Sequence, residues 1–149
     1  MNDENGDPID IQCVEVDLKR RKEELGRVIV DLLDDYARDL FGGLEPLSDY
    51  TRTNIVDKLA ALPIAHVFLA KVNNEYCGLT ICFEGFSTFA CKPLINVHDM
   101  YVKPAYRGRG VASSLLFTVG RCDTNILTSI LHILYGITYI FITSKSNIY

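Results

Sequence analysis

A short glycine-containing segment, Arg107-Gly108-Arg109-Gly110-Val111-Ala112, constrains this chain more than any other stretch of its sequence. The preceding residues Leu94–Val102 are rich in strand-formers, and the following SSLLFTV is compatible with a helix. Glycines at a strand–loop–helix junction let successive backbone N–H groups converge on an anion, and the helix start adds partial positive charge. The two arginines add charge-assisted hydrogen bonds. The segment therefore predicts a site for a pyrophosphate group.

Two widespread nucleotide-binding motifs do not match this segment. The P-loop pattern G-x-x-x-x-G-K-[ST] is absent from the sequence. A dinucleotide G-x-G-x-x-G motif that began at Gly108 would need its third glycine at position 113, where the chain has Ser113. Both nucleotide-loop interpretations therefore fail.

The composition indicates one globular domain without a general affinity for nucleic acid. The 149 residues are 48% hydrophobic and carry a net charge of −4, so no excess of Lys and Arg is available to neutralise phosphates. The five cysteines are an odd number without a C-x-x-C pair, which favours a reducing cytoplasm and predicts no metal site. Residues 1–10 lack the basic start and apolar run of a signal peptide, and we expect a disordered lead-in.

The pattern of apolar residues predicts an α+β domain. Asp17 and Ser48 are suitable N-caps for two helices, of which the first ends before Gly42-Gly43 and the second before Pro63. The order strand, helix, helix and three strands differs from a regular βαβ series. The expected strands are Ile11–Val16, His66–Lys71, Glu75–Phe83 and Leu94–Val102, and the expected helices are Leu18–Leu40, 48–62 and the one after the glycine loop.

The glycine loop also fits the pattern [QR]-x-x-G-x-[GA], as Arg107-x-x-Gly110-x-Ala112. The surrounding residues 100–116, MYVKPAYRGRGVASSLL, resemble the strand-four-to-helix-three segment of the GNAT N-acetyltransferases, and the upstream element order is similar too. The resemblance covers residues 11–120. It implies an acyl-CoA N-acyltransferase fold, with a mainly antiparallel central sheet flanked by helices and an acetyl-CoA-binding core over residues 11–120.

The resemblance also implies where acetyl-CoA binds. The main chain of Met100, Tyr101 and Val102 should meet the pantetheine and the thioester. An N–H group near Met100 would then polarise the thioester carbonyl and stabilise the tetrahedral intermediate. The residues expected to hold the pyrophosphate are Arg107, Gly108, Arg109, Gly110, Val111, Ala112 and Ser113.

Direct attack by an amine requires a general base or a water relay. The candidates near the cleft strands are Glu84, His98 and Asp99. Because strand side chains alternate, we expect His98 and Asp99 to point to opposite faces, so that only one can face the substrate. Cys82 and Cys91 lie in no signature of a catalytic pair, and we assign no catalytic cysteine.

The last part of the chain, residues 121–149, departs from the family. Neither the usual fifth strand nor an N-x-x-A-x-x-x-Y-x-x-x-G-F-like helix is recognisable, and no role is carried over to Tyr135 or Tyr139. Three interpretations stay open: extra strands that include Ile137–Thr143, an altered reading frame or splice, or a membrane span over the mostly apolar Ile126–Ile142. On the sequence alone, the C-terminal half of the fold is incomplete.

The functional hypothesis is a cytoplasmic N-acetyltransferase that moves the acetyl group of acetyl-CoA to a primary amine of a small molecule or peptide by direct attack. Two alternatives remain. One is a truncated, catalytically weak domain that binds CoA or a partner, and the other is a protein tethered to a membrane through its C-terminal tail. We expect no nucleic acid as a partner and consider membrane association the less favoured alternative. Whether the protein forms a homodimer stays open.

Overall fold

The computed structural model describes residues 10–121, 127–132 and 138–142. Within these residues, six strands form one sheet in the order β1-β2-β3-β4-β5-β6, and all neighbours are antiparallel except β4 and β5. The predicted α+β class with a mainly antiparallel sheet is confirmed. The strands are β1 Ile11–Glu15, β2 Ala65–Val72, β3 Glu75–Ser87, β4 Lys92–Val102, β5 Leu127–His132 and β6 Thr138–Ile142. The helices are α1 Leu18–Arg38, α2 Asp49–Ala61, the short 3-10 helix η1 Pro104–Tyr106 and α3 Val111–Arg121.

The helix starts follow the predicted caps. The Asp17 side chain accepts hydrogen bonds from the first amides of α1, and the Ser48 hydroxyl accepts one from the Thr51 amide at 3.1 Å. Helix α1 ends at Arg38, two residues before the predicted end. The reason is local: Asp39 is already extended, and its side chain accepts the amide of Phe41 at 3.0 Å, which replaces a further helical turn.

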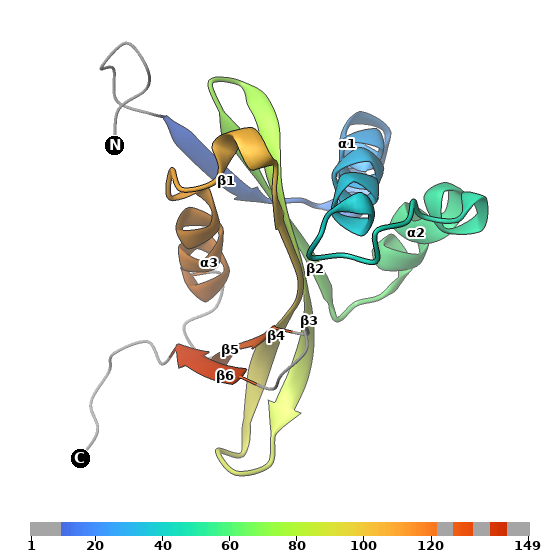
Figure 1. Cartoon of the computed structure of the whole chain (residues 1–149). Coiled ribbons are helices and arrows are strands. Elements are labelled where there is room, and N and C mark those ends of the chain that lie inside the picture. Colours follow the sequence, from blue (N-terminus) through green and yellow to red (C-terminus); the bar gives the residue numbers. More distant parts are fainter. Residues whose placement is uncertain (1–9, 122–126, 133–137, 143–149) are drawn as a thin grey trace.

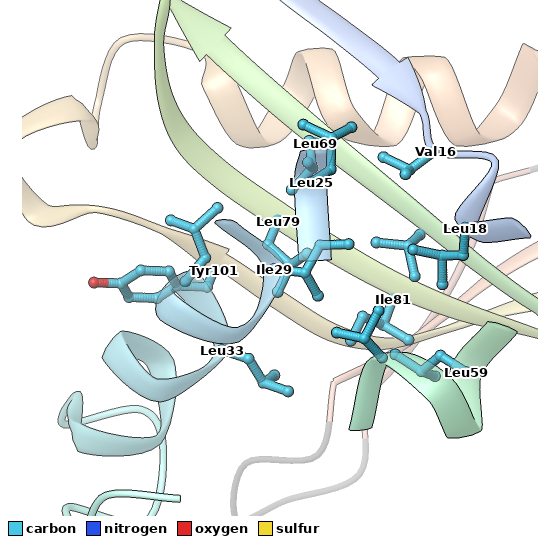
Figure 2. Packing of buried hydrophobic residues seen from close by; sticks show 13 residues of the cluster. Val16, Leu18, Leu25, Ile29, Leu33, Leu59, Leu69, Leu79, Ile81 and Tyr101 are labelled. Carbon is cyan, nitrogen blue, oxygen red and sulfur yellow. The ribbon is translucent and has the colours of Figure 1, made fainter. Parts of the chain in front are cut away.

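The helices form layers on both sides of the sheet. Helices α1 and α2 lie on one face and α3 on the other (Figure 1). The core on the α1 side joins Leu25, Ile29 and Leu79 with Tyr101 of β4 (Figure 2). On the other side α3 packs closely on β3, because a Cβ atom built at Gly78 would lie only 3.1 Å from side-chain atoms of α3. This close approach fixes the start of α3 against the middle of the sheet.

Strand β4 is the element that positions the site. It pairs with β5 only from Leu94 opposite Leu127 to Val97 opposite Ile130. Opposite β3, the register shifts between Ile81, which pairs with Asp99, and Cys82, which pairs with Val97, so that His98 is an extra residue in a β-bulge. A bulge bends its strand and increases the local twist. Strand β4 is therefore redirected at the point where its pairing with β5 ends.

The C-terminal segment contributes to the sheet. Strand β5 is a fifth strand that the sequence did not reveal, and β6 at residues 138–142 lies within Ile137–Thr143, where extra strands were one of the open interpretations. The proposed membrane span Ile126–Ile142 is wrong for its described parts, which are these two strands; residues 126 and 133–137 lie outside the described residues. Within the part of the chain that the structure describes, every helix is too short or too polar to cross a bilayer. The predicted lead-in also lies outside it, apart from Asp10.

Candidate active site

Among the described residues, nothing pairs with the outer edge of the second half of β4, which we call its open edge. Met100, Tyr101 and Val102 are paired on one side with Thr80, Leu79 and Gly78 of β3, whereas the pairing with β5 has ended at Val97. Backbone N–H and C=O groups on such an edge are available to a partner that binds as an added strand. An amide-containing chain such as pantetheine has groups that fit this edge.

The glycine loop follows at the end of this edge. Gly108 and Gly110 have φ angles of +74° and +85°, in the left-handed region that glycine adopts without strain, and a Cβ atom at either position would meet nothing within 4 Å. The first hydrogen bond of α3 runs from the Ser114 amide to the Gly110 carbonyl at 3.0 Å. The amides of Val111, Ala112 and Ser113 therefore precede the hydrogen-bonded ladder and can bind an anion at the positive end of the helix.

The two arginines of the loop differ in their contacts. Arg107 donates from Nε to the Val102 carbonyl at 2.8 Å and from Nη2 to Asp39 at 2.6 Å, and its guanidinium lies over the rings of Phe41 and Tyr101. Arg109 lies over the Tyr106 ring and forms no ion pair with any described residue. The side chain that is available to a phosphate is thus that of Arg109, whereas Arg107 holds the loop against α1.

A cavity of about 220 Å³ lies beside the open edge of β4. Its walls come from the end of α1, from β4 and from the loop: Tyr36, Asp39, Phe41, Met100, Tyr101, Val102, Arg107 and Ala112. The ring of Tyr101 belongs to the aliphatic core, while its hydroxyl points away from the labelled core residues (Figure 2). We refer to this space as the cofactor cavity.

A second cavity of about 390 Å³, here named the acceptor cavity, is lined by Asp99 together with Leu33, Tyr36, Ala37, Phe41, Gly42, Gly43 and Leu47. Burial raises the pKa of Asp99 above its ordinary value, and the charge of the neighbouring His98 only partly offsets this. Tyr36 and Phe41 line both cavities. Burial also raises the pKa of Tyr36, so that its hydroxyl stays protonated at neutral pH.

The expectation that His98 and Asp99 point to opposite faces is wrong. The His98 ring lies edge-on to Phe83, 5.3 Å between centroids, and Phe83 packs against the core on the α1 side. Asp99 lines the acceptor cavity on the same side. The bulge at His98 causes this, because an extra residue breaks the alternation of side chains along the strand.

Glu84, the third predicted base, lies away from the acceptor cavity. Its carboxylate is 2.8 Å from Nε2 of His66, whose Nδ1 is 2.6 Å from Glu15. His66 is paired opposite Cys82, a residue of the core on the α3 side. Glu84 thus belongs to a polar group on the opposite face of the sheet from Asp99.

Tyr36, Asp39 and Phe41 line these cavities, although the sequence pattern did not indicate them as site residues. Tyr36 fitted the apolar stripe of α1, and Asp39 and Phe41 lay within or just after a helix that was expected to continue to Leu40. The available signal was the Gly42-Gly43 pair, which requires a turn just where the chain meets β4 and the loop.

The predicted cofactor residues, in contrast, lie close together in the sequence, in the unit formed by β4, the loop and α3. They are Met100, Tyr101, Val102, Gly108, Gly110, Val111, Ala112 and Ser113.

Comparison with known families agrees with this geometry. The sequence model of the acetyltransferase (GNAT) domain matches residues 63–137, about half of the chain, and includes β4, the glycine loop and α3. The chain belongs to the GNAT family. GNAT proteins are acetyltransferases that use acetyl-CoA, so the chain is an acyltransferase and acetyl-CoA is its co-substrate.

Individual relatives are similar over most of the chain. An uncharacterized N-acetyltransferase of Archaeoglobus fulgidus is 29% identical over 100 residues, which are 62% of this chain and 68% of that protein. The fold is similar to that of an aminoglycoside acetyltransferase from an uncultured soil metagenomic sample, solved with sisomicin, with a TM-score of 0.62 at 15% identity over 81% of this chain and 75% of the other. It is also similar to an aminoglycoside N-acetyltransferase in complex with CoA, with a TM-score of 0.59 at 16% identity over 81% of this chain and 77% of the other.

Proposed function

We propose that this GNAT protein transfers the acetyl group of acetyl-CoA to a primary amine of a small molecule held in the acceptor cavity. One observation carries this proposal: the cofactor cavity along β4 and the acceptor cavity at Asp99 share Tyr36 and Phe41 as common walls. A thioester aligned with β4 at Met100 and an amine beside Asp99 would therefore lie close to each other, next to Tyr36 and Phe41. Such positioning replaces a bimolecular encounter by an oriented reaction.

In this proposal the main chain of Met100, Tyr101 and Val102 aligns the pantetheine and a backbone N–H near Met100 polarises the thioester carbonyl. The amides of Val111, Ala112 and Ser113 and the guanidinium of Arg109 bind the pyrophosphate. Gly108 and Gly110 provide the positive φ angles that turn the chain from η1 into α3. The assignment is supported by the open edge, the unstrained loop and the family membership.

Asp99 acts as the general base. It accepts a proton from the ammonium form of the amine, which then attacks the thioester carbonyl carbon, and a raised pKa makes the carboxylate a better acceptor. The nitrogen of the tetrahedral intermediate then loses its second proton to water, the C–S bond breaks, and the hydroxyl of Tyr36 donates its proton to the departing sulfur. The products are an amide and the free thiol of CoA, and the protons taken up and given by Asp99 and Tyr36 exchange with water.

A thiol-release assay with acetyl-CoA and a panel of primary amines, together with calorimetry of CoA binding, tests this function. We expect saturable thiol release that depends on the amine. Arg109→Glu should weaken CoA binding about ten-fold or more, because it replaces a phosphate-binding cation by an anion. Arg27→Glu is the matched control, since Arg27 is exposed on α1 far along the helix from the loop, and it should bind CoA normally.

Two results would contradict the proposal. CoA binding without amine-dependent thiol release would favour a domain that binds CoA without turnover. Equal CoA affinity in the wild type and Arg109→Glu would show that the pyrophosphate lies elsewhere.

The compartment is expected to be the reducing cytoplasm, and the support is that Cys13, Cys77 and Cys91 are free thiols.

A further inference from the structure

The described side chains that line the acceptor cavity are mostly apolar and include one carboxylate. Its side chains are aliphatic or aromatic, with the hydroxyl of Tyr36 and the carboxylate of Asp99 as the polar side-chain groups: Leu33, Tyr36, Ala37, Phe41, Leu47 and Asp99, together with Gly42 and Gly43. Its volume of about 390 Å³ is at the small end of the range for small-molecule sites. The cavity thus offers one ionic anchor and an apolar wall.

The other acidic residues of α1 and the turn after it are not available to a ligand in this cavity. Asp34 is bound by Arg38 at 2.9 Å, by Arg52 at 2.6 Å and by the Leu47 amide at 2.8 Å. Asp39 is bound by Arg107 and by the amide of Phe41. The remaining acidic residues of these segments are exposed and do not line the cavity: Glu23, Glu24, Asp31, Asp35 and Glu45. Among the described residues, Asp99 is therefore the single carboxylate that a ligand in the cavity can pair with.

This distribution of charge selects among amines. The positive charge of an ammonium group beside Asp99 is paired with the carboxylate. An apolar substituent gains free energy when it is buried against Leu33, Phe41 and Leu47. A second ammonium group on the same molecule would lose its hydration without gaining a partner, which is costly in an apolar environment. A polyamine or a sugar with several amino groups would need further carboxylates, which these walls do not provide.

We infer that the acceptor is a small monoamine, in which an alkyl or aryl body carries the reacting primary amine as its only positive charge. This inference rests on the proposed acetyl transfer at Asp99 and defines the class of its substrate. The preference follows from two features of the described lining: Asp99 is its one anion, and the other side chains are mostly apolar.

Two amines of equal length test the inference. Hexylamine and 1,6-diaminohexane differ in the second charge, so the ratio of their kcat/KM values isolates its effect; phenethylamine and kanamycin extend the comparison to an aryl monoamine and a polycation. We expect hexylamine and phenethylamine to be acetylated with a kcat/KM at least ten-fold above those of the diamine and kanamycin. A diamine or kanamycin that is the better substrate overturns the inference but leaves the acetyl transfer intact. Failure of all amines, with CoA bound, contradicts the proposed transfer itself.

Gly43→Asp supplies a second carboxylate beside that of Asp99. A Cβ atom at Gly43 would have only Ala37 O within 4 Å, at 3.9 Å, and the φ angle of Gly43 lies outside the left-handed region, so a side chain fits there without strain. We expect Gly43→Asp to reduce the preference for hexylamine over the diamine by at least five-fold. Gly43→Asn, which has the same shape without the charge, should keep the wild-type ratio. If both variants change the ratio of kcat/KM for hexylamine over the diamine equally, charge is not the cause of the preference. If either variant folds poorly, the ratio measured for the wild type decides the inference.

Discussion

Nη2 of Arg107 lies 2.6 Å from Oδ2 of Asp39, and this ion pair joins the glycine loop after β4 to the turn that ends α1. The hydrogen bond from Phe41 N–H and the guanidinium of Arg107 hold the pKa of Asp39 below its ordinary value. Arg107 also donates to the carbonyl of Val102, the last residue of β4. The pair therefore fixes the relative position of the cofactor edge and the wall shared by the two cavities, and Arg107 is a positioning residue.

Asp39→Asn tests whether Arg107 positions the loop or binds phosphate directly. Because the loop would lose its anchor, we expect CoA affinity to fall three- to ten-fold, roughly 1 kcal/mol. Arg107→Met should have a similar effect, and the double variant Asp39→Asn/Arg107→Met should lose little more than either single variant. The measurement is calorimetric binding of CoA. Tighter binding by Asp39→Asn would instead mean that Asp39 competes with the pyrophosphate for Arg107.

Asp99→Asn tests the general base. The substitution keeps the shape of the side chain but removes its ability to accept a proton, and we expect kcat to fall by about 10²-fold or more. Since burial raises the pKa of Asp99, the wild-type kcat/KM should decrease as the pH falls through a value above the ordinary 3.8, where the carboxylate becomes protonated. The acidic limb of the pH profile should be absent in Asp99→Asn, and CoA affinity should be unchanged. A limb that survives in the variant would assign it to another group.

The strand–loop–helix unit of the proposed cofactor edge could be predicted from the sequence, and the residues of the acceptor cavity could not. The loop residues Arg107–Ala112 are contiguous, so a local pattern and its flanking strand and helix were sufficient to place them. The acceptor cavity joins residues of α1 and the following turn to Asp99 of β4, which is more than fifty positions away and meets them only through the fold. The predicted orientation of His98 was wrong for a related reason, because the position of a bulge depends on the register with β3. Likewise β5 has no motif and is defined by its pairing with β4.

Tyr36→Phe tests proton donation to the leaving thiolate. Tyr36 lines both cavities, and its raised pKa keeps the hydroxyl protonated over the neutral range. Loss of the hydroxyl should reduce kcat about ten-fold or more with acetyl-CoA, since the sulfur would then leave as an anion. A thioester with a more acidic thiol needs less protonation, so its kcat should fall less. Tyr50→Phe, at an exposed tyrosine of α2, is the control and should retain full activity. Equal losses with both thioesters would argue for a structural role of the Tyr36 hydroxyl.

Asp34→Asn tests the anchor of the turn between α1 and α2. The side chain of Asp34 is only 10% exposed, and its bonds to Arg38, Arg52 and the Leu47 amide lower its pKa to about 2. A lowered pKa stabilises the fold above the ordinary value of 3.8, and this stabilisation is lost as the pH falls toward 2. We expect a loss of about 1–2 kcal/mol at neutral pH, discounted because Arg38 and Arg52 are more exposed. Urea unfolding at pH 7 and pH 3 measures it, and the difference between the two proteins should be smaller at pH 3.

His66→Gln tests the polar group formed by Glu15, His66 and Glu84 on the other face of the sheet. Burial lowers the pKa of His66, but the two carboxylates together outweigh burial and raise it above the ordinary 6.5. The protonated imidazole therefore stabilises the folded state fully below pH 6.5, and this contribution is lost as the pH rises through the raised value. Because both carboxylates are partly exposed, the effect should be about 1 kcal/mol or less. Thermal unfolding between pH 5.5 and 8.5 should show a decline in wild-type Tm that His66→Gln lacks.

Glu84→Gln then separates this structural role of Glu84 from catalysis. Its carboxylate is bound to His66 and lies on the opposite face of the sheet from Asp99, so we expect the variant to weaken the pH dependence of Tm and to leave kcat within two-fold of the wild type. Glu15→Gln is the matched control, because it removes the other carboxylate on the same imidazole. A loss of turnover in Glu84→Gln that Glu15→Gln does not share would return Glu84 to the list of candidate bases and would require the acceptor amine to approach from the α3 side of the sheet.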